Sequence, residues 1–154
     1  MDITRSIHID APAERVWSLV SDLPGMGRLS PENAGGSWRK GATGPAVGAR
    51  FRGRNRKGVR RWSTNVQVTR CEPGRSFAFE VSTVGAIPIA EWSYATEPDL
   101  AGGCTVSESW ADRRPGWFKR PAALLTGSNY NDSAAVVGNL DKTLAALKQM
   151  AEGH

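Results

Sequence analysis

The chain has 154 residues, of which 40% are hydrophobic and 23% are charged, as in a globular domain with its own core. No apolar run approaches the length of about 18 residues that a membrane-spanning helix needs, and the first ten residues lack the apolar segment of a signal peptide. We therefore expect a single cytoplasmic domain over residues 1–154. The net charge of +5 permits an acidic partner without requiring one.

The N-terminal third predicts one strand and two short helices. Residues 3–9 alternate apolar and polar side chains, which is the period of a half-buried strand. Apolar residues at helical spacing follow from Val16 to Leu23, and Pro24 then ends this helix. A second short helix or turn is expected over 26–29. Residues 33–48 are rich in Gly and are expected to form a loop, apart from a short strand near 37–40.

Alternating apolar and polar residues predict about five further strands between residues 47 and 110. Turn signals at Asn55–Gly58, Glu72–Arg75 and Pro98–Gly103 make the connections short. Neighbours in sequence are therefore expected to pair as an antiparallel meander. The residues assigned to the inner face are Val47, Ala49, Phe51, Trp62, Thr64, Val66, Val68, Phe77, Phe79, Val81, Trp92, Tyr94, Val106, Glu108 and Trp110.

The stretch Asn131–Ala151 predicts a long amphipathic helix, capped at its start by Asn131 or Asp132 and ended by Gly153. Its apolar stripe consists of Val137, Leu140, Leu144, Leu147 and Ala151. Such a helix needs an apolar partner surface to be stable. The predicted fold is therefore α+β: a curved antiparallel sheet of about six to seven strands wrapped around a C-terminal helix, with a cavity between them.

Five blocks of the sequence resemble the START-like (SRPBCC) superfamily, which includes Bet v 1-type proteins and polyketide cyclases. These blocks are Ile7–Asp22, Leu29–Glu32, Pro73–Val81, Trp92–Pro98 and Gly102–Trp110. The resemblance covers essentially the whole chain and implies the helix-grip fold. Because that fold hosts binders, lipid carriers, cyclases and hydrolase activators, the resemblance implies no single activity. The motifs SPENAGGSW, RRWST and DRRPGWF resemble most closely the members described only as polyketide cyclase or dehydrase.

Six of the twelve aromatic residues are Trp, which favours a roomy, partly polar interior or a binding surface. We expect an apolar ligand to lie against part of the inner face, whereas ordinary core packing is the alternative and is expected of Phe51 and Phe77. The residues expected to bind the ligand are Trp62, Phe79, Trp92, Tyr94, Glu108 and Trp110.

Glu108 is the candidate for chemistry, because alternation with Val106 and Trp110 places its carboxyl group inside. A buried carboxyl needs a partner, and desolvation raises its pKa toward the range of a general acid or base. The alternative is a structural or ligand-orienting role. In the structural role, its expected partner is Arg113, Arg114 or the N–H group of Trp62 or Trp92. One carboxyl is weak evidence for an enzyme, so structural and ligand-orienting roles are favoured over catalysis.

The leading hypothesis is a binder or carrier of a small hydrophobic molecule, such as a lipid or a polyketide-like aromatic. The rival is a polyketide cyclase or dehydratase that uses Glu108 for proton transfer. His8 falls on the polar side of its strand and His154 is terminal, so no Ser-His-Asp set is available. No cofactor and no metal site is predicted. Cys71 and Cys104 match no zinc spacing, and reduced thiols are favoured over a disulfide.

Two basic segments suggest further partners. Seven Lys and Arg residues lie between Arg50 and Arg61, and a third hypothesis is an interaction module that binds an acidic protein, a nucleic acid or an anionic membrane. Alternation and the lack of interleaved aromatics favour a solvated outer face instead. In Arg113–Pro121, Trp117 and Phe118 either meet a lipid interface, gate the cavity or pack under the long helix. A short helix is expected over 116–126.

Overall fold

The computed structural model describes residues 2–29, 33–39, 41–57, 59–83, 87–114 and 133–153. The strands are β1 (Asp2–Ile9), β2 (Asn33–Arg39), β3 (Arg50–Lys57), β4 (Arg60–Glu72), β5 (Ser76–Thr83), β6 (Pro88–Pro98) and β7 (Cys104–Asp112). The helices are α1 (Ala13–Val20), the 3-10 helix η1 (Leu23–Arg28) and α3 (Ser133–Glu152).

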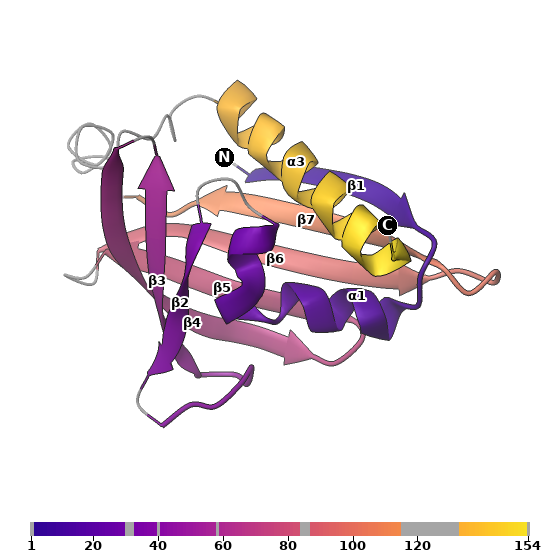
Figure 1. Ribbon diagram of the computed structural model, residues 1–154, viewed down its shortest axis with the longest axis horizontal. Helices are drawn as coiled ribbons and strands as arrows, with labels where there is room; N and C mark the ends of the chain where they lie inside the picture. The colour runs from indigo at the N-terminus through magenta and orange to yellow at the C-terminus, as the bar shows by residue number, and fades with distance from the viewer. Residues whose placement is uncertain are drawn as a thin grey trace.

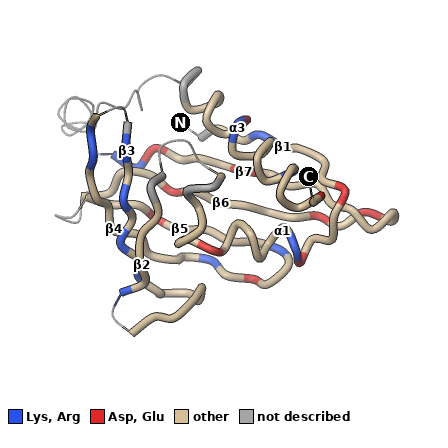
Figure 2. Tube along the Cα trace, viewed as in Figure 1, with Lys and Arg blue, Asp and Glu red and all other residues tan. Residues whose placement is uncertain are grey.

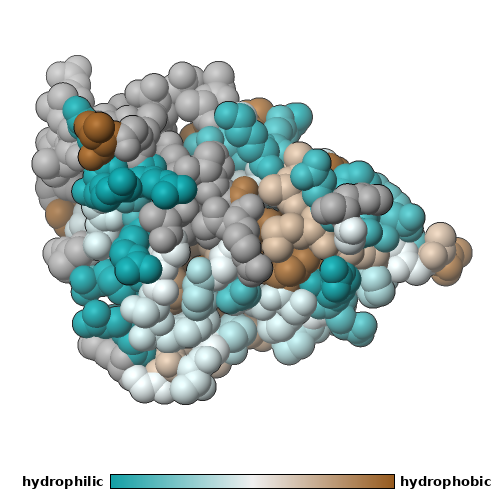
Figure 3. All heavy atoms as spheres, viewed as in Figure 1, coloured by the Kyte–Doolittle hydropathy of each residue, from teal (hydrophilic) through white to brown (hydrophobic). Residues whose placement is uncertain are grey.

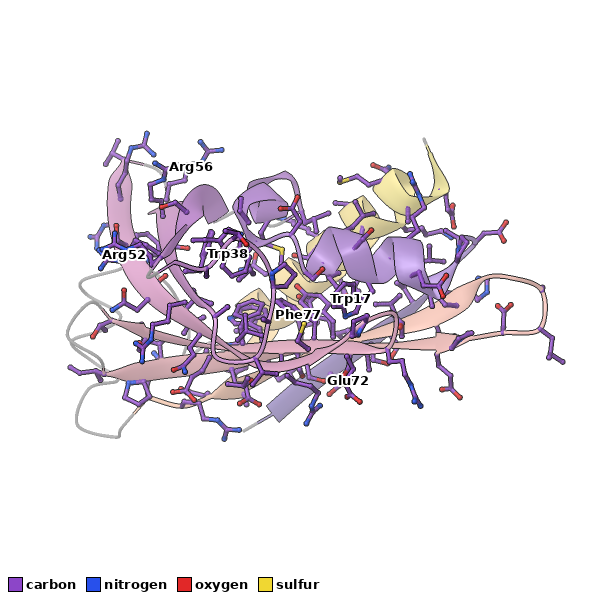
Figure 4. The ribbon with its side chains drawn as sticks, turned by 90° about the horizontal axis from the view of Figure 1, so that it is seen from below. Trp17, Trp38, Arg52, Arg56, Glu72 and Phe77 are labelled. Carbon is purple, nitrogen blue, oxygen red and sulfur yellow. The ribbon has the colours of Figure 1, made fainter. Side chains whose placement is uncertain are left out.

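The seven strands form one antiparallel sheet in the order β1-β7-β6-β5-β4-β3-β2. Successive strands from β2 to β7 are neighbours, as the short turns predict, and β1 joins the free side of β7. Figure 1 shows β5, β6 and β7 side by side along the molecule, while β2 and β3 cross them steeply where the sheet bends. The helices α1 and α3 cover the same face (Figure 4). The predicted helix-grip fold is confirmed.

The inner face of the sheet follows the predicted alternation closely. Most of the residues assigned to it are buried, while Ala49, Trp62, Val81 and Trp92 are half-buried. Val47 is the exception: it is 68% exposed, because β3 begins only at Arg50 and Val47 lies in the preceding turn.

The Gly-rich stretch was predicted to be mostly loop, which is wrong for its first half, because β2 spans Asn33–Arg39. Gly36 pairs with Gly53 and has a φ of 155°. A Cβ atom at Gly36 would lie 2.2 Å from the Arg52 carbonyl oxygen and 2.6 Å from the Phe51 ring. Glycine is therefore required here because the Phe51 ring packs directly on the β2 backbone.

The long C-terminal helix is confirmed, with a small change in its buried stripe. Val136 is buried in place of the predicted Val137, which is half-buried, and the stripe continues through Leu140 to Ala151. Gly153 ends the helix in a left-handed conformation, with φ +81°, and its N–H donates to the Met150 carbonyl. The predicted caps at 131 and 132 lie outside the described residues.

The C-terminal end of α3 is held by α1. The guanidinium group of Arg15 donates hydrogen bonds to the carbonyl oxygens of Ala151 and Met150, at 2.7 and 3.1 Å. They are among the last carbonyls of the helix, and a cation beside them complements the helix dipole. The two hydrogen bonds from Arg15 therefore hold the C-terminal end of α3 against α1.

Two clusters of buried apolar residues lie beneath α3. The larger contains α1, η1 and the C-terminal half of α3, with Phe77, Phe79 and Val106 from the sheet. The smaller joins the N-terminal half of α3 to Ile89, Ala90 and Trp110. Trp92 packs against both clusters. Cys71 and Cys104 are both free, so the disulfide alternative is wrong.

Candidate functional site

A polar pair lies on the inner face between these two apolar clusters. On β7, Val106 belongs to the larger cluster and Trp110 to the smaller, and Glu108 comes between them. On β6, Tyr94 stands directly opposite Glu108 in the register. Because cross-strand partners point to the same face, the two side chains meet inside the core.

Glu108 and Tyr94 form one short hydrogen bond. The Tyr94 hydroxyl donates to Glu108 Oε2 at 2.5 Å, and Glu108 is only 1% exposed. Glu108 Oε1 is also buried, and it has no hydrogen-bond partner among the described residues. An unpaired buried polar atom costs about 1–3 kcal/mol. One carboxyl oxygen of this pair is therefore left available to bind something else.

Burial determines the charge state of the pair. Loss of water raises the pKa of Glu108 from 4.5 to about 8, and the hydrogen bond from Tyr94 opposes this rise. The neutral acid therefore outnumbers the carboxylate about tenfold at pH 7. Burial, and next the nearby Glu108, raise the pKa of Tyr94 well above its usual value. Both groups carry a proton at neutral pH, so the pair presents a hydrogen-bond donor.

The arginines expected to accompany Glu108 are engaged elsewhere, so that prediction is wrong. The Arg114 side chain donates from Nε to Asp112 Oδ1 and from Nη2 to Asp112 Oδ2, both at 3.0 Å. Arg113 lies 3.8 Å from Glu91. Neither arginine is paired with Glu108, whose hydrogen-bond partner is Tyr94.

A third arginine, Arg5, lies next to Glu108 in the sheet but is paired with another carboxylate. Arg5 on β1 stands directly opposite Glu108, on the side away from Tyr94. Its guanidinium Nε and Nη2 donate to Asp141 Oδ1 and Oδ2 on α3, at 2.9 and 3.3 Å. The Arg5 charge is thereby directed to the edge between β1 and α3, and Glu108 keeps Tyr94 as its partner.

The aromatic candidates fall into one row beside this pair. Trp110, Trp92 and Phe79 are successive cross-strand partners on β7, β6 and β5. They adjoin the row that contains Glu108 and Tyr94, so five of the six predicted ligand-binding residues lie together. Trp62 does not join them: it pairs with Asn55 on β3, beyond the end of the pairing between β4 and β5.

Two tryptophans that were not predicted to bind a ligand also lie over the inner face (Figure 4). Trp17 on α1 donates from Nε1 to the Ser76 carbonyl at 2.8 Å and meets the Phe77 ring edge-on. Trp38 on β2 packs edge-on against Phe51. The helical spacing of Trp17 was the only sequence signal for its position, and Trp38 lay in the Gly-rich stretch.

Other candidate groups lie away from this site. His8 is exposed, as predicted, and its ring nitrogen is 2.7 Å from Asp99 Oδ2 on the outside of the sheet. The segment containing Trp117 and Phe118, and the helix predicted over 116–126, lie outside the described residues. Of the helices described, none is both long and apolar enough to span a membrane.

The chain resembles solved structures of related fold. A Polyketide_cyc-like protein from Corynebacterium glutamicum is 31% identical, with a TM-score of 0.64 over 98% of this chain and 91% of that one. The di-domain ARO/CYC BexL from the BE-7585A biosynthetic pathway is 21% identical, with a TM-score of 0.66 over 97% of this chain and 45% of that one. Major latex-like protein 151 from Panax ginseng is 10% identical, with a TM-score of 0.70 over 98% and 97%.

The search of curated proteins found no match. The family model described as "Polyketide cyclase / dehydrase and lipid transport" matches residues 1–152, which is nearly the whole chain. With the helix-grip fold and the similarity to the Corynebacterium protein, this match establishes that the chain belongs to the polyketide cyclase/dehydrase and lipid transport family.

Proposed function

We propose that this protein binds a small hydrophobic molecule between the sheet and α3, with its polar end at Glu108. The observation that carries the proposal is the buried Glu108 Oε1, which has no partner among the described residues although apolar clusters surround it. Buried polar atoms are almost always hydrogen-bonded, so a lone one requires an explanation. A ligand oxygen that accepts the carboxylic proton would satisfy it.

The ligand class follows from the neutral acid. A carboxylic acid donates to a carbonyl, ether or hydroxyl oxygen, whereas a ligand carboxylate would have to bury its charge among the apolar residues that surround Glu108. The row of Trp110, Trp92 and Phe79 offers flat apolar contact beside that oxygen. We therefore expect an uncharged apolar ligand with an oxygen acceptor, as in a polyketide-like aromatic or a lipid alcohol.

Native mass spectrometry of protein purified from its own organism, followed by denaturing extraction, tests the binding proposal. A retained hydrophobic molecule with an oxygen acceptor is the expected result. The follow-up is a binding assay with a ketone, an alcohol and a hydrocarbon of equal length. Glu108→Leu should remove the preference for the oxygenated ligands, while Trp92→Ala should weaken all three. No binding of any member of a broad lipid and polyketide panel would refute the proposal.

A second candidate is proton transfer to a bound polyketide chain during cyclisation or dehydration. The observation that favours it is the burial of Glu108, which raises its pKa to about 8, together with the hydrogen bond from Tyr94 that orients it. Glu108→Gln keeps a neutral hydrogen-bonding group of the same shape but has no acidic proton. Loss of turnover with retained ligand binding would support an enzyme, and unchanged turnover would refute this role for Glu108.

A further inference from the structure

The outer face of β2, β3 and β4 carries a group of arginines. Phe51 and Val66 face the core, so their sequence neighbours point outward. The exposed arginines of this face are Arg39, Arg50, Arg54, Arg56 and Arg61. Figure 2 shows the positive residues along β3 and its hairpin with β4, and Figure 4 shows Arg52 and Arg56 at the bent end of the sheet.

This arrangement places like charges against each other. Arg39 is the direct cross-strand partner of Arg50, and Arg56 is that of Arg61. Like charges in these positions destabilise a sheet. Among the described residues, none of the five exposed arginines of this face forms an ion pair with a carboxylate. An anionic partner bound to this face would offset the loss of folding stability that the paired arginines cause.

The tip of the β3–β4 hairpin adds an apolar group to this charge. Val59 is 98% exposed at the turn, between Lys57 and Arg60, which end and begin the two strands. Single exposed apolar residues are common. Leu100 is one, at the β6–β7 turn, but acidic Asp99 precedes it. Val59 differs because positive residues precede and follow it.

We propose that this hairpin tip docks on an anionic phospholipid surface, with Val59 entering the interfacial layer and Arg56 and Arg61 binding lipid phosphates. Arginine matches phosphate geometry, and polybasic segments are attracted to anionic membranes.

A nucleic acid fits less well, since the outer face of β2–β4 has no aromatic residue for base stacking in the described strands. Figure 3 shows hydrophilic atoms gathered on the β3–β4 side. Docking here is independent of which ligand the interior holds.

Sedimentation of the full chain with vesicles tests this proposal. The vesicles are phosphatidylcholine alone, or phosphatidylcholine and phosphatidylserine mixed at two to one. We expect binding only to the mixed vesicles, decreasing with added salt. The double variant Arg56→Gln/Arg61→Gln should bind about 30-fold more weakly, since each charge near such a surface contributes about fivefold. Val59→Ser should weaken binding about fivefold.

Matched controls separate the tip from the overall charge. Arg70→Gln/Arg75→Gln removes the same charge from exposed positions, and Arg70 lies roughly 30 Å along β4 from Arg61. Leu100→Ser removes an equally exposed apolar side chain. Both controls should bind like the native chain. An equal loss in the Arg70/Arg75 control, no binding to the mixed vesicles, or tighter binding to a single-stranded oligonucleotide or an acidic protein would overturn the proposal.

Discussion

Glu108 keeps its proton because the core removes water from it and no described cation reaches it. Tyr94 is its hydrogen-bond partner from β6, and Arg5, which faces it from β1, is bound to Asp141 of α3. Phe77, which is the cross-strand partner of Tyr94, and Val106 belong to the larger apolar cluster beside the pair. A neutral acid in such surroundings donates a hydrogen bond and avoids the large cost of a buried charge.

This charge state predicts a loss of stability as the pH rises. The unfolded carboxyl ionises near pH 4.5, but in the folded chain Glu108 holds its proton up to about pH 8. Between these values the unfolded state alone gives up the proton, so unfolding becomes easier by on the order of 3 to 5 kcal/mol. Glu108→Gln should remove this dependence. Urea denaturation at several pH values measures it, and identical pH profiles for both chains would contradict it.

Tyr94→Phe tests the pair from its other side. The substitution removes the hydroxyl that donates to Glu108 Oε2 and leaves both carboxyl oxygens without a described partner. We expect a loss of about 1–3 kcal/mol in the free energy of unfolding. In a double-mutant cycle with Glu108→Leu, the losses of stability should not be additive. Glu108→Leu removes the carboxyl oxygens that Tyr94→Phe would otherwise leave unpaired. Additive effects would show that the hydrogen bond contributes nothing.

Alternation along β7 was enough to predict that Glu108 is buried, because no bulge interrupts that strand. Its partner was not predictable in the same way. Alternation assigns a residue to a face, but only the register between β6 and β7 places Tyr94 opposite Glu108. That register is set by the geometry of the turn between Pro98 and Cys104, which an alternating pattern does not give.

At the level of elements, the β2 strand depends on a glycine where a side chain does not fit. Gly36→Ala should destabilise the fold by at least 1–3 kcal/mol, since its Cβ would overlap the Arg52 carbonyl and the Phe51 ring. Gly102→Ala is the matched control: Gly102 also has a positive φ, at +92°, but open space around it. Thermal denaturation should show a clearly larger loss for Gly36→Ala, and equal losses would refute the packing explanation.

The element boundaries that the sequence missed have one physical origin. Glycine, asparagine and lysine are poor indicators of a strand, so the first residues of β2 and the last residues of β3 were assigned to loops, although tertiary packing makes them strands. Within β4, the register shifts between Val68 and Arg70, which brings Cys71 opposite Phe77. Such a bulge leaves no mark on an alternating pattern.

At the scale of the whole molecule, stability depends on the sheet gripping α3. Leu144 is almost fully buried in the larger cluster. Leu144→Ala should lower the free energy of unfolding by about 2–5 kcal/mol, because it removes apolar contact and leaves a cavity. Lys142→Ala, at an exposed position of the same helix, should change it by less than about 0.5 kcal/mol. Urea denaturation of both variants measures the free energy of unfolding. A small effect of Leu144→Ala would contradict the claim that stability depends on the packing of α3 against the sheet.

The position of β1 at the far side of β7 has a consequence for how the chain reaches this structure. The contact between Thr4 and Ser109 joins residues 105 positions apart, and the whole β1–β7 ladder has similar separations. During synthesis the first strand therefore has no partner until β7 has left the ribosome. Closure of long loops delays folding, so the meander should form first and the N-terminal strand should complete the sheet late.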